Sequence, residues 1–213
     1  MKQKNKILRF LTAELEKTYG WGQTERILEL AQPMYDRLCQ EHADAPKAVK
    51  KHTHLMVYPT VALYKAMQEL EIPQQQALDF LDKAHSLRVE PAARSMQTLL
   101  KIPGLYKKLP ALYKWMTVHN FGTASGFSAD FKDTGKNRCQ FDMTKCIYCD
   151  SCRACGCPEL IPCFCHTDDV TSGHMHPKIL WNRTKTMGEG ADVCDFDVIV
   201  LKEGEDPRDY RKS

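Results

Sequence analysis

The chain has 213 residues, of which 43% are hydrophobic and 27% are charged, and this ordinary balance excludes a disordered or collagen-like protein. Thirty Lys and Arg against 27 Asp and Glu leave a net charge of only +3, so no nucleic-acid partner is expected from charge. The longest apolar run, residues 55–64, is interrupted by Pro59 and is shorter than the roughly 20 residues that cross a bilayer, so no membrane segment is expected.

The first half of the chain, from residue 5 to about 118, is predicted to be helical. Apolar residues recur there at helical spacing, and Gly20 and Gly22 are expected to end the first helix. A disturbance is expected at Pro59, because proline lacks the N–H that a helix interior needs. The later helices are predicted at residues 24–39, 46–71, 73–87, 92–101 and 105–118.

The second half alternates in hydrophobicity, as strands do, at residues 127–131, 137–145, 179–187 and 193–201. No regular helix separates each pair of strands, which predicts an antiparallel sheet and hence an α+β fold. The expected organisation is a helical region (1–120) packed with an antiparallel α+β region (121–203) into one integrated domain, followed by a charged tail (204–213). A Cys-rich stretch, residues 146–165, is inserted in the second region.

Cysteine is the most uneven feature of the sequence. Seven of the ten cysteines fall within residues 146–165, whereas only Cys39 lies in the first 138 residues. The basic N-terminus is interrupted by acidic residues and resembles no secretion signal, so a cytoplasmic location is expected. Thiols stay reduced there, and their crowding indicates a metal, a cluster or sulfur chemistry in place of disulfides.

Two metal sites are compatible with the spacing in this stretch. Cys146, Cys149, Cys152 and Cys157 form C-x2-C-x2-C-x4-C-P, one residue longer than the bacterial iron–sulfur run, and are the predicted metal ligands. Alternatively, two of the C-x2-C pairs could hold a zinc ion. Redox-active thiols and plain burial of small apolar side chains remain open as well, and no cofactor is assigned beyond a possible iron–sulfur cluster or zinc.

A thiol and a carboxylate follow the Cys-rich stretch. Cys165 and Asp168 are three residues apart, so on one helical turn they would share a face. A carboxylate in that place can act as a general acid or base, and the thiol can act as a nucleophile if its pKa is lowered. These two residues are candidate catalytic residues.

Polar side chains on the last two predicted strands extend the candidate site. Alternation places Arg183 and Lys185 on one face and Thr184 and Thr186 on the other. A cation with hydroxyl groups close by in the chain could bind a substrate carboxylate. Cys194 opens the last strand and is either a core residue or a member of the site.

Two motifs in the C-terminal half resemble those of the L-2-amino-thiazoline-4-carboxylic acid hydrolase family. Residues 156–168 (GCPELIPCFCHTD) resemble its G-x-P-E-L-x-x-x-F-C-x-x-D stretch, and residues 183–196 (RTKTMGEGADVCDF) resemble its R-T-x-T-L-x-x-G-x-x-x-C-D-F ending. Cys146 also falls where the family often carries a cysteine. The resemblance covers about residues 139–198, whereas the other cysteines of the Cys-rich stretch depart from the pattern.

This resemblance implies a hydrolase that opens the 2-amino-thiazoline ring, a cyclic isothiourea, towards a carbamoyl-cysteine. It implies Cys165, Asp168 and Cys194 as catalytic residues, and Arg183 and Thr186 as substrate-binding residues. The expected partner is a small-molecule substrate. The alternative is a non-catalytic iron–sulfur, zinc-binding or small-molecule-sensing module on the same fold, because the extra cysteines are not part of the family pattern.

Overall fold

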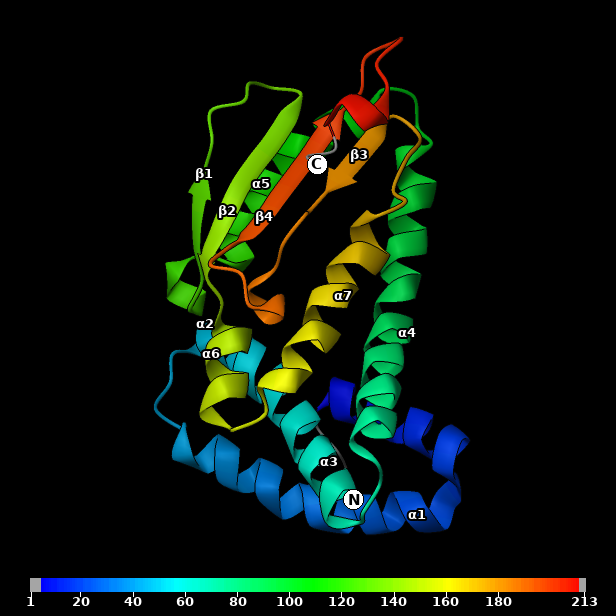
Figure 1. Cartoon of the computed structure of the whole chain (residues 1–213), viewed down its shortest axis with the longest axis vertical. Coiled ribbons are helices and arrows are strands. Elements are labelled where there is room, and N and C mark those ends of the chain that lie inside the picture. The colour runs from blue at the N-terminus through cyan, green and yellow to red at the C-terminus, as the bar shows by residue number, and fades with distance from the viewer. Residues whose placement is uncertain (1–4, 211–213) are drawn as a thin grey trace. The chain divides into compact units, whose positions relative to one another are not determined.

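The computed structural model describes residues 5–210, and residues 1–4 and 211–213, which include the end of the expected tail, lie outside the described residues. The chain divides into two compact units, each built from two segments. The first unit comprises the chain up to Arg88 together with Ile147–Phe164, and the second comprises Val89–Cys146 together with the chain from Cys165 onward. The predicted helical first half and antiparallel C-terminal sheet are both confirmed (Figure 1).

The first unit is helical. In Figure 1, α1 lies beside α3, and the two helices are in extensive contact. The elements of this unit are α1 (Lys6–Glu41), α2 (Lys47–His52), α3 (Tyr58–Glu69), the first half of α4 (Gln74–Leu100), α6 (Ile147–Ala154) and the first turn of α7 (Ile161–Ser172). Leu11, Leu15, Ile27, Leu63 and Met67 are fully buried in its core.

The interruptions predicted near Gly20 and Pro59 are both present. Gly20 has φ +75° and ψ 167° inside α1, a backbone conformation essentially restricted to glycine, so the first helical segment ends there and a second segment follows after a kink. A single π-helical turn, Thr53–Val57, precedes Pro59. Pro59 cannot donate the backbone hydrogen bond of a regular helix, and the wider turn absorbs that loss. α4, in contrast, runs without a break through Pro91, where separate helices were expected.

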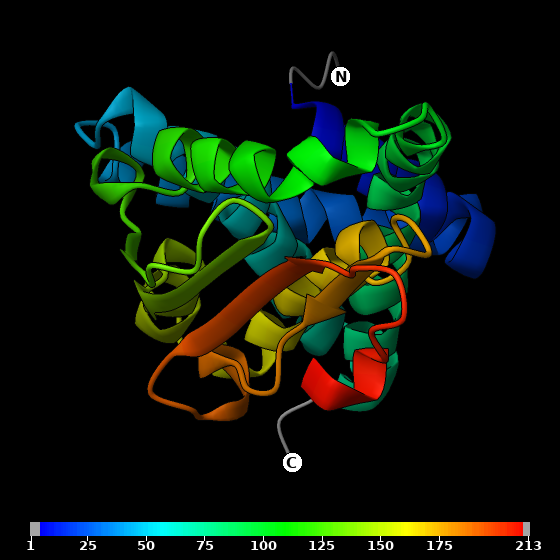
Figure 2. The same ribbon diagram turned by 90° about the horizontal axis from the view of Figure 1, so that it is seen from above.

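The second unit carries the sheet. Its strands are β1 (Ser128–Phe131), β2 (Arg138–Lys145), β3 (Ile179–Asn182) and β4 (Cys194–Val200), all antiparallel, in the order β1-β2-β4-β3. Phe141 of β2 pairs with Phe196 of β4, and the two rings stack with centroids 4.9 Å apart. α5 (Leu109–Asn120) crosses one face and contacts β2 and β4 (Figure 2).

Two C-terminal segments differ from the predictions. β3 ends at Asn182, whereas the strand was expected to continue to residue 187, so Arg183–Thr186 form a loop. The backbone of this loop bonds to a side chain in place of a neighbouring strand, as described below. A 3-10 turn, Pro207–Tyr210, forms where an irregular tail was expected, and the Tyr210 carbonyl accepts a hydrogen bond of 3.0 Å from Asn182 Nδ2.

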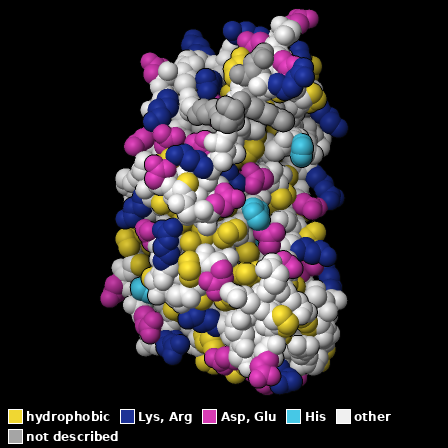
Figure 3. Space-filling model, viewed as in Figure 1, with side chains coloured by type: hydrophobic (Ala, Val, Ile, Leu, Met, Phe, Trp, Pro, Cys, Tyr) yellow, Lys and Arg dark blue, Asp and Glu magenta, His cyan; other side chains and the backbone are white. Residues whose placement is uncertain are grey.

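The distribution of surface charge and the character of the helices agree with the composition of the chain. Acidic and basic side chains are interspersed on the face shown in Figure 3, consistent with the small net charge. No helix within residues 5–210 combines the length and the apolar character needed to cross a bilayer.

Candidate functional site

Helix α7 presents the predicted thiol and carboxylate. It starts at Ile161 with Pro162 in its first turn, where proline is well tolerated because the first N–H groups have no partner within the helix. Cys165 and Asp168 lie one turn apart on this helix, as the spacing predicts. Both belong to the second unit, together with the loop after β3 and with β4.

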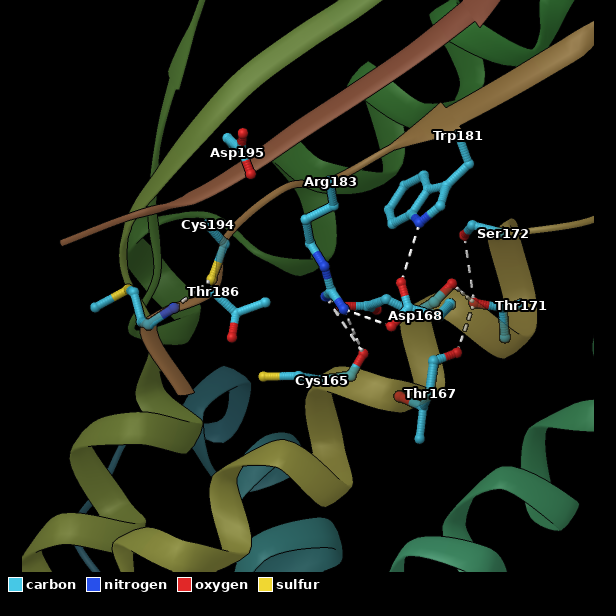
Figure 4. A network of polar contacts seen from close by, with 12 residues as sticks. Cys165, Thr167, Asp168, Thr171, Ser172, Trp181, Arg183, Thr186, Cys194 and Asp195 are labelled. Atoms are coloured by element: carbon cyan, nitrogen blue, oxygen red, sulfur yellow. Dashed lines mark hydrogen bonds and ion pairs between the residues drawn. The ribbon is translucent and has the colours of Figure 1, made fainter. Parts of the chain in front are cut away.

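Arg183 joins the loop after β3 to α7. Its side chain is only 5% exposed, and its Nη1 lies 3.2 Å from Asp168 Oδ2 while Nη2 lies 2.6 Å from Asp169 Oδ2. Both Nη atoms also donate to the Cys165 carbonyl, each at 3.3 Å, and the guanidinium lies over the Phe196 ring, 5.7 Å from its centroid. Figure 4 shows this fork between the helix and the loop. Because its donors are held by groups of the chain, the guanidinium positions Asp168 and the Cys165 backbone.

The loop itself is organised by Asp195, at the start of β4. Its carboxylate accepts hydrogen bonds from the backbone N–H groups of Thr184 and Lys185, both at 2.8 Å, and from Thr184 Oγ1 at 2.5 Å. Burial alone would raise the pKa of Asp195, but these hydrogen bonds lower it overall. The carboxylate therefore replaces the strand partner that residues 183–186 lack.

Thr186 closes the turn that follows. It is buried, and its Oγ1 accepts from the Glu189 backbone N–H at 3.1 Å while donating to Glu189 Oε2 at 2.9 Å. The hydroxyl thus caps the turn as the first residue of a capping box does, while the Glu189 carboxylate bonds to the Thr186 hydroxyl and not to its backbone N–H. The hydroxyl proton is thus used within the turn.

Cys194 lies against the same turn. Its Sγ accepts a hydrogen bond of 3.2 Å from the Met187 backbone N–H. Burial raises the pKa of this thiol, and the hydrogen bond from Met187 partly offsets the increase. Cys146 and Asp168 are among the groups that influence it electrostatically, which places Cys194 in one cluster with them.

Cys165 belongs to this cluster through its side chain. Burial raises the pKa of its thiol to about 12, and the charges of Asp168, Cys194 and Cys146 add to the increase while Arg183 opposes it. In Figure 4 the Cys165 sulfur points towards Thr186 and Cys194, whereas the Asp168 carboxylate faces Arg183. The thiol is consequently protonated at neutral pH, contrary to the lowered pKa that a resting thiolate requires.

Asp168 remains accessible although its surroundings are poorly solvating. Its side chain is 46% exposed, and Oδ2 carries the contact with Arg183. Within residues 5–210, Oδ1 has no hydrogen-bond partner. Desolvation raises the pKa of the carboxyl to about 6, although Arg183 lowers it. The group therefore changes charge close to neutral pH and has one oxygen available to a small molecule.

The five predicted catalytic and substrate-binding residues all lie in the second unit, whereas the predicted metal ligands are divided between the two units by the chain segments to which they belong. Cys149, Cys152 and Cys157 lie in the first unit, where each is at most 1% exposed, whereas Cys146 belongs to the second unit. Burial raises the pKa of Cys157 to about 11. Among the described residues, no three His, Cys, Asp or Glu side chains are grouped so that they could hold a metal ion.

The metal hypothesis is thus a prediction without support from this geometry, and core packing of small thiols accounts for the burial. None of the ten cysteines, all of which lie in the described part of the chain, forms a disulfide. Binding of zinc or of an iron–sulfur cluster by Cys146, Cys149, Cys152 and Cys157 stays a prediction.

Three acidic residues of the site were not predicted. Asp169 accepts from Arg183 and, at 3.2 Å, from Trp181 Nε1. The T-x-x-E spacing of Thr186 and Glu189 is a signal that could have revealed the cap of this turn, whereas the roles of Asp169 and Asp195 depend on contacts between elements.

These features define an α+β protein whose C-terminal sheet and α7 carry a thiol–carboxylate cluster tied together by one arginine. The sequence pattern of the L-2-amino-thiazoline-4-carboxylic acid hydrolase family matches residues 50–198, which is well over half of the chain. The chain belongs to this family and is a hydrolase of that family. No curated protein matches it.

Solved structures give only distant similarities. An H-NOX protein from S. oneidensis in the Fe(II)NO ligation state is 13% identical, covering 94% of this chain and 100% of that chain at a TM-score of 0.39. A structure from a study of heme distortion in the H-NOX family is 10% identical, covering 99% and 100% of the two chains at a TM-score of 0.36. Neither likeness is close enough to carry an argument.

Proposed function

We propose that this protein hydrolyses a small carboxylated sulfur heterocycle of the 2-amino-thiazoline-4-carboxylate type to a carbamoyl-cysteine. The observation that carries the proposal is the cluster on α7, in which Cys165 and the accessible carboxylate of Asp168 are held beside Cys194 by Arg183. The family provides the substrate class, and the cluster provides a nucleophile and a group that can transfer protons near neutral pH.

The substrate carbon to be attacked lies between the ring sulfur and two nitrogens. Because the Cys165 thiol is protonated, its attack is coupled to proton transfer: Sγ bonds to this carbon while the thiol proton moves to the ring nitrogen, and the C=N double bond becomes single. The free Oδ1 of Asp168 accepts an N–H of the amidine group and holds the carbon near the sulfur.

Ring opening follows from the resulting tetrahedral centre. The bond between the carbon and the ring sulfur breaks, and a C=N bond forms again as the exocyclic nitrogen gives a proton to Asp168. Asp168 then passes that proton to the departing sulfur, so the carboxylate is restored. The product of this stage is an isothiourea bound covalently to Cys165.

Water completes the reaction. It adds to the C=N bond of the isothiourea, and the bond to Cys165 Sγ then breaks while the added hydroxyl becomes the carbonyl of the product and returns its proton to the thiol. The sum is one substrate and one water giving one carbamoyl-cysteine. In this scheme Arg183 and Thr186 are positioning residues, because the donors of Arg183 and the hydroxyl of Thr186 are engaged within the chain.

The variants Cys165→Ala and Asp168→Asn test the proposal with L-2-amino-thiazoline-4-carboxylate as the substrate. We expect both to lower kcat by at least about 100-fold, the usual scale for losing a nucleophile or a general base. The measurement is mass spectrometry of the product, which is one water heavier than the substrate, with far-UV circular dichroism to confirm folding. Cys155→Ala removes a partly exposed thiol of the first unit and serves as the control.

A covalent adduct at Cys165 in acid-quenched wild-type protein would be the specific signature of the scheme. Full turnover by both variants would exclude this site. A wild-type protein that is stabilised by the substrate yet forms no product would indicate a ligand-binding module of the family fold in place of an enzyme.

A further inference from the structure

A second group of polar side chains lies inside the first unit and takes no part in the proposed hydrolysis. Its centre is His85 on α4, whose side chain is completely buried. The imidazole packs against the Phe164 ring, with centroids 5.1 Å apart, and its Nε2 lies 2.9 Å from Thr60 Oγ1 of α3. A buried histidine needs a partner for each ring nitrogen, since an unsatisfied polar atom in the interior is costly.

The hydrogen bonds of Thr60 determine the tautomer of His85. Thr60 Oγ1 donates its single proton to the Met56 carbonyl at 2.8 Å. Nε2 of His85 must therefore carry the hydrogen of the bond to Thr60, which leaves Nδ1 with a lone pair. That Nδ1 atom is buried and has no hydrogen-bond partner in the described part of the chain. The Nδ1 atom of His85 can therefore accept a hydrogen bond from a ligand.

Arg88 presents the complementary need one turn further along α4. Residues three apart lie on the same helix face, and the charge of Arg88 lowers the pKa of His85, as does burial, which is the larger cause. The Nε of Arg88 is buried without a hydrogen-bond partner, and no carboxylate among residues 5–210 pairs with this guanidinium. Buried cations in proteins are normally paired, because an uncompensated charge is expensive to desolvate.

Aromatic side chains frame the two groups. Tyr148 of α6 stacks on Phe164, with ring centroids 5.2 Å apart, and its hydroxyl lies 2.9 Å from His52 Nδ1. Tyr148 is also close enough to Arg88 to influence its pKa electrostatically. In the described part of the first unit, Nε of Arg88 and Nδ1 of His85 thus lack hydrogen-bond partners beside aromatic rings. A few polar groups among aromatic side chains are typical of small-molecule sites.

We propose that His85 and Arg88 form a binding site for a small monocarboxylate that carries an O–H or N–H donor next to its carboxylate. The guanidinium pairs with the carboxylate in its usual forked geometry, and the adjacent donor reaches Nδ1. A monoanion is preferred over a dianion such as phosphate, because the proposed site supplies one charge, that of Arg88, and His85, with a pKa of about 3, stays neutral. The proposed binding uses none of the catalytic residues and does not depend on the proposed hydrolysis.

The test is binding of glycolate, the smallest hydroxy acid of this class, to the full-length chain. Protein with 15N-labelled histidine is titrated with glycolate, acetate and inorganic phosphate in turn, and the His85 resonances are followed by NMR. The free protein should show the Nε2–H tautomer. Glycolate should bind saturably and shift Nδ1, whereas acetate lacks the donor and should bind at least about fivefold more weakly, as expected for one lost hydrogen bond.

Substitutions separate a binding role from a structural one. Arg88→Gln should weaken glycolate binding by about tenfold or more, the effect of removing a charged hydrogen-bond partner. Arg94→Gln, at an exposed position of the same helix, should change it by less than about twofold, since exposed pairs contribute little. No saturable shift with glycolate, equal binding of acetate or phosphate, or unchanged binding in Arg88→Gln would overturn the proposal. If Arg88→Gln does not fold, the wild-type comparison of the three anions still decides.

Discussion

The surroundings of Asp168 raise the pKa of its carboxyl group. An ordinary aspartate is ionised well below neutral pH, but here desolvation outweighs the nearby Arg183 and raises the pKa to about 6. The side chain is nevertheless accessible, so a substrate can reach it. A group in this state can both accept and return a proton during one catalytic cycle.

This pKa predicts the pH dependence of hydrolysis. The proposed role needs the ionised carboxylate, which accepts the amidine N–H, and protonation below the pKa removes that acceptor. We therefore expect kcat/KM to rise with pH and to level off above an apparent pKa of about 6. The measurement is a pH–rate profile between about pH 4.5 and 8, a range that extends about 1.5 to 2 units on either side of that pKa. A profile that is flat across pH 6, or that falls there, would contradict the role.

The immediate surroundings of Cys165 explain why its thiol is not ionised in the free protein. Its sulfur is enclosed, and the neighbouring thiols and acid all disfavour a negative charge. A nucleophile of this kind reacts only when a substrate takes its proton as the bond forms. Such a thiol is protected from reaction in the absence of substrate, because the thiolate is the reactive species.

At the scale of elements, the loop between β3 and β4 depends on side chains for its hydrogen bonds. Asp195 satisfies two backbone N–H groups and one hydroxyl, and Thr186 with Glu189 closes the following turn. Most polar residues of the family motif R-T-x-T…C-D-F therefore stabilise the conformation of this loop. It holds Arg183 against α7.

Asp195→Ala should release this loop. Two backbone donors and one hydroxyl lose a charged acceptor, which is expected to cost about 2–3 kcal/mol of unfolding free energy. The free energy is measured by urea denaturation at neutral pH. Asp192→Ala is the matched control, because Asp192 is exposed and its carboxylate contacts only the exposed Lys185 and the adjacent Val193 N–H among the described residues, so a small effect is expected there. Equal effects of the two variants would show that the loop does not rely on Asp195.

Helix α1 offers a paired test of its bend. Gly20 has a positive φ, so Gly20→Ala should destabilise the protein by about 1–3 kcal/mol through backbone strain alone, since no atom lies within 4 Å of the added methyl group. Gly22 lies in the regular helix with equally open space, and Gly22→Ala should stabilise by about 0.5–1 kcal/mol. Thermal and urea unfolding of both variants would show opposite signs. The same sign for both would mean that α1 is not bent at Gly20.

At the scale of the whole molecule, each compact unit is assembled from two separate segments of the chain. The first unit needs residues 147–164, which contribute Leu160, Cys152 and Ile161 to its buried side chains. Tyr64 also donates a 2.5 Å hydrogen bond to Glu159 across the two segments. This glutamate belongs to the G-x-P-E-L motif, whose role in the unit is therefore structural.

This assembly predicts that the helical region does not fold alone. A fragment of residues 1–120 lacks α6 and the start of α7, so it should show helical circular dichroism but no cooperative thermal transition. The full-length chain, melted in parallel, provides the comparison. A fragment with a sharp transition would instead support the boundary at residue 120 that the sequence pattern suggests.

Much of the fold could be read from periodicity, because periodicity is local. Alternation over residues 137–145 and 193–201 corresponds to β2 and β4, and the helical spacing of the first half corresponds to the observed helices. The failures lie where a distant residue decides the local structure. β3 stops at Asn182 because the following backbone bonds to Asp195, which no spacing within residues 179–187 reveals.

The amino-acid sequence by itself determined the order of helices and strands, the family motifs and the one-turn spacing of Cys165 and Asp168, since each of these depends on residues close together in the chain. The tertiary structure decided which groups those residues meet. It placed Arg183 between two carboxylates and a carbonyl, enclosed the Cys165 thiol, and buried Cys149, Cys152 and Cys157 in the first unit. Among the described residues it left Nδ1 of His85 and Nε of Arg88 without hydrogen-bond partners. Charge pairing and desolvation act through space, so they become visible only when segments far apart in the chain are brought together.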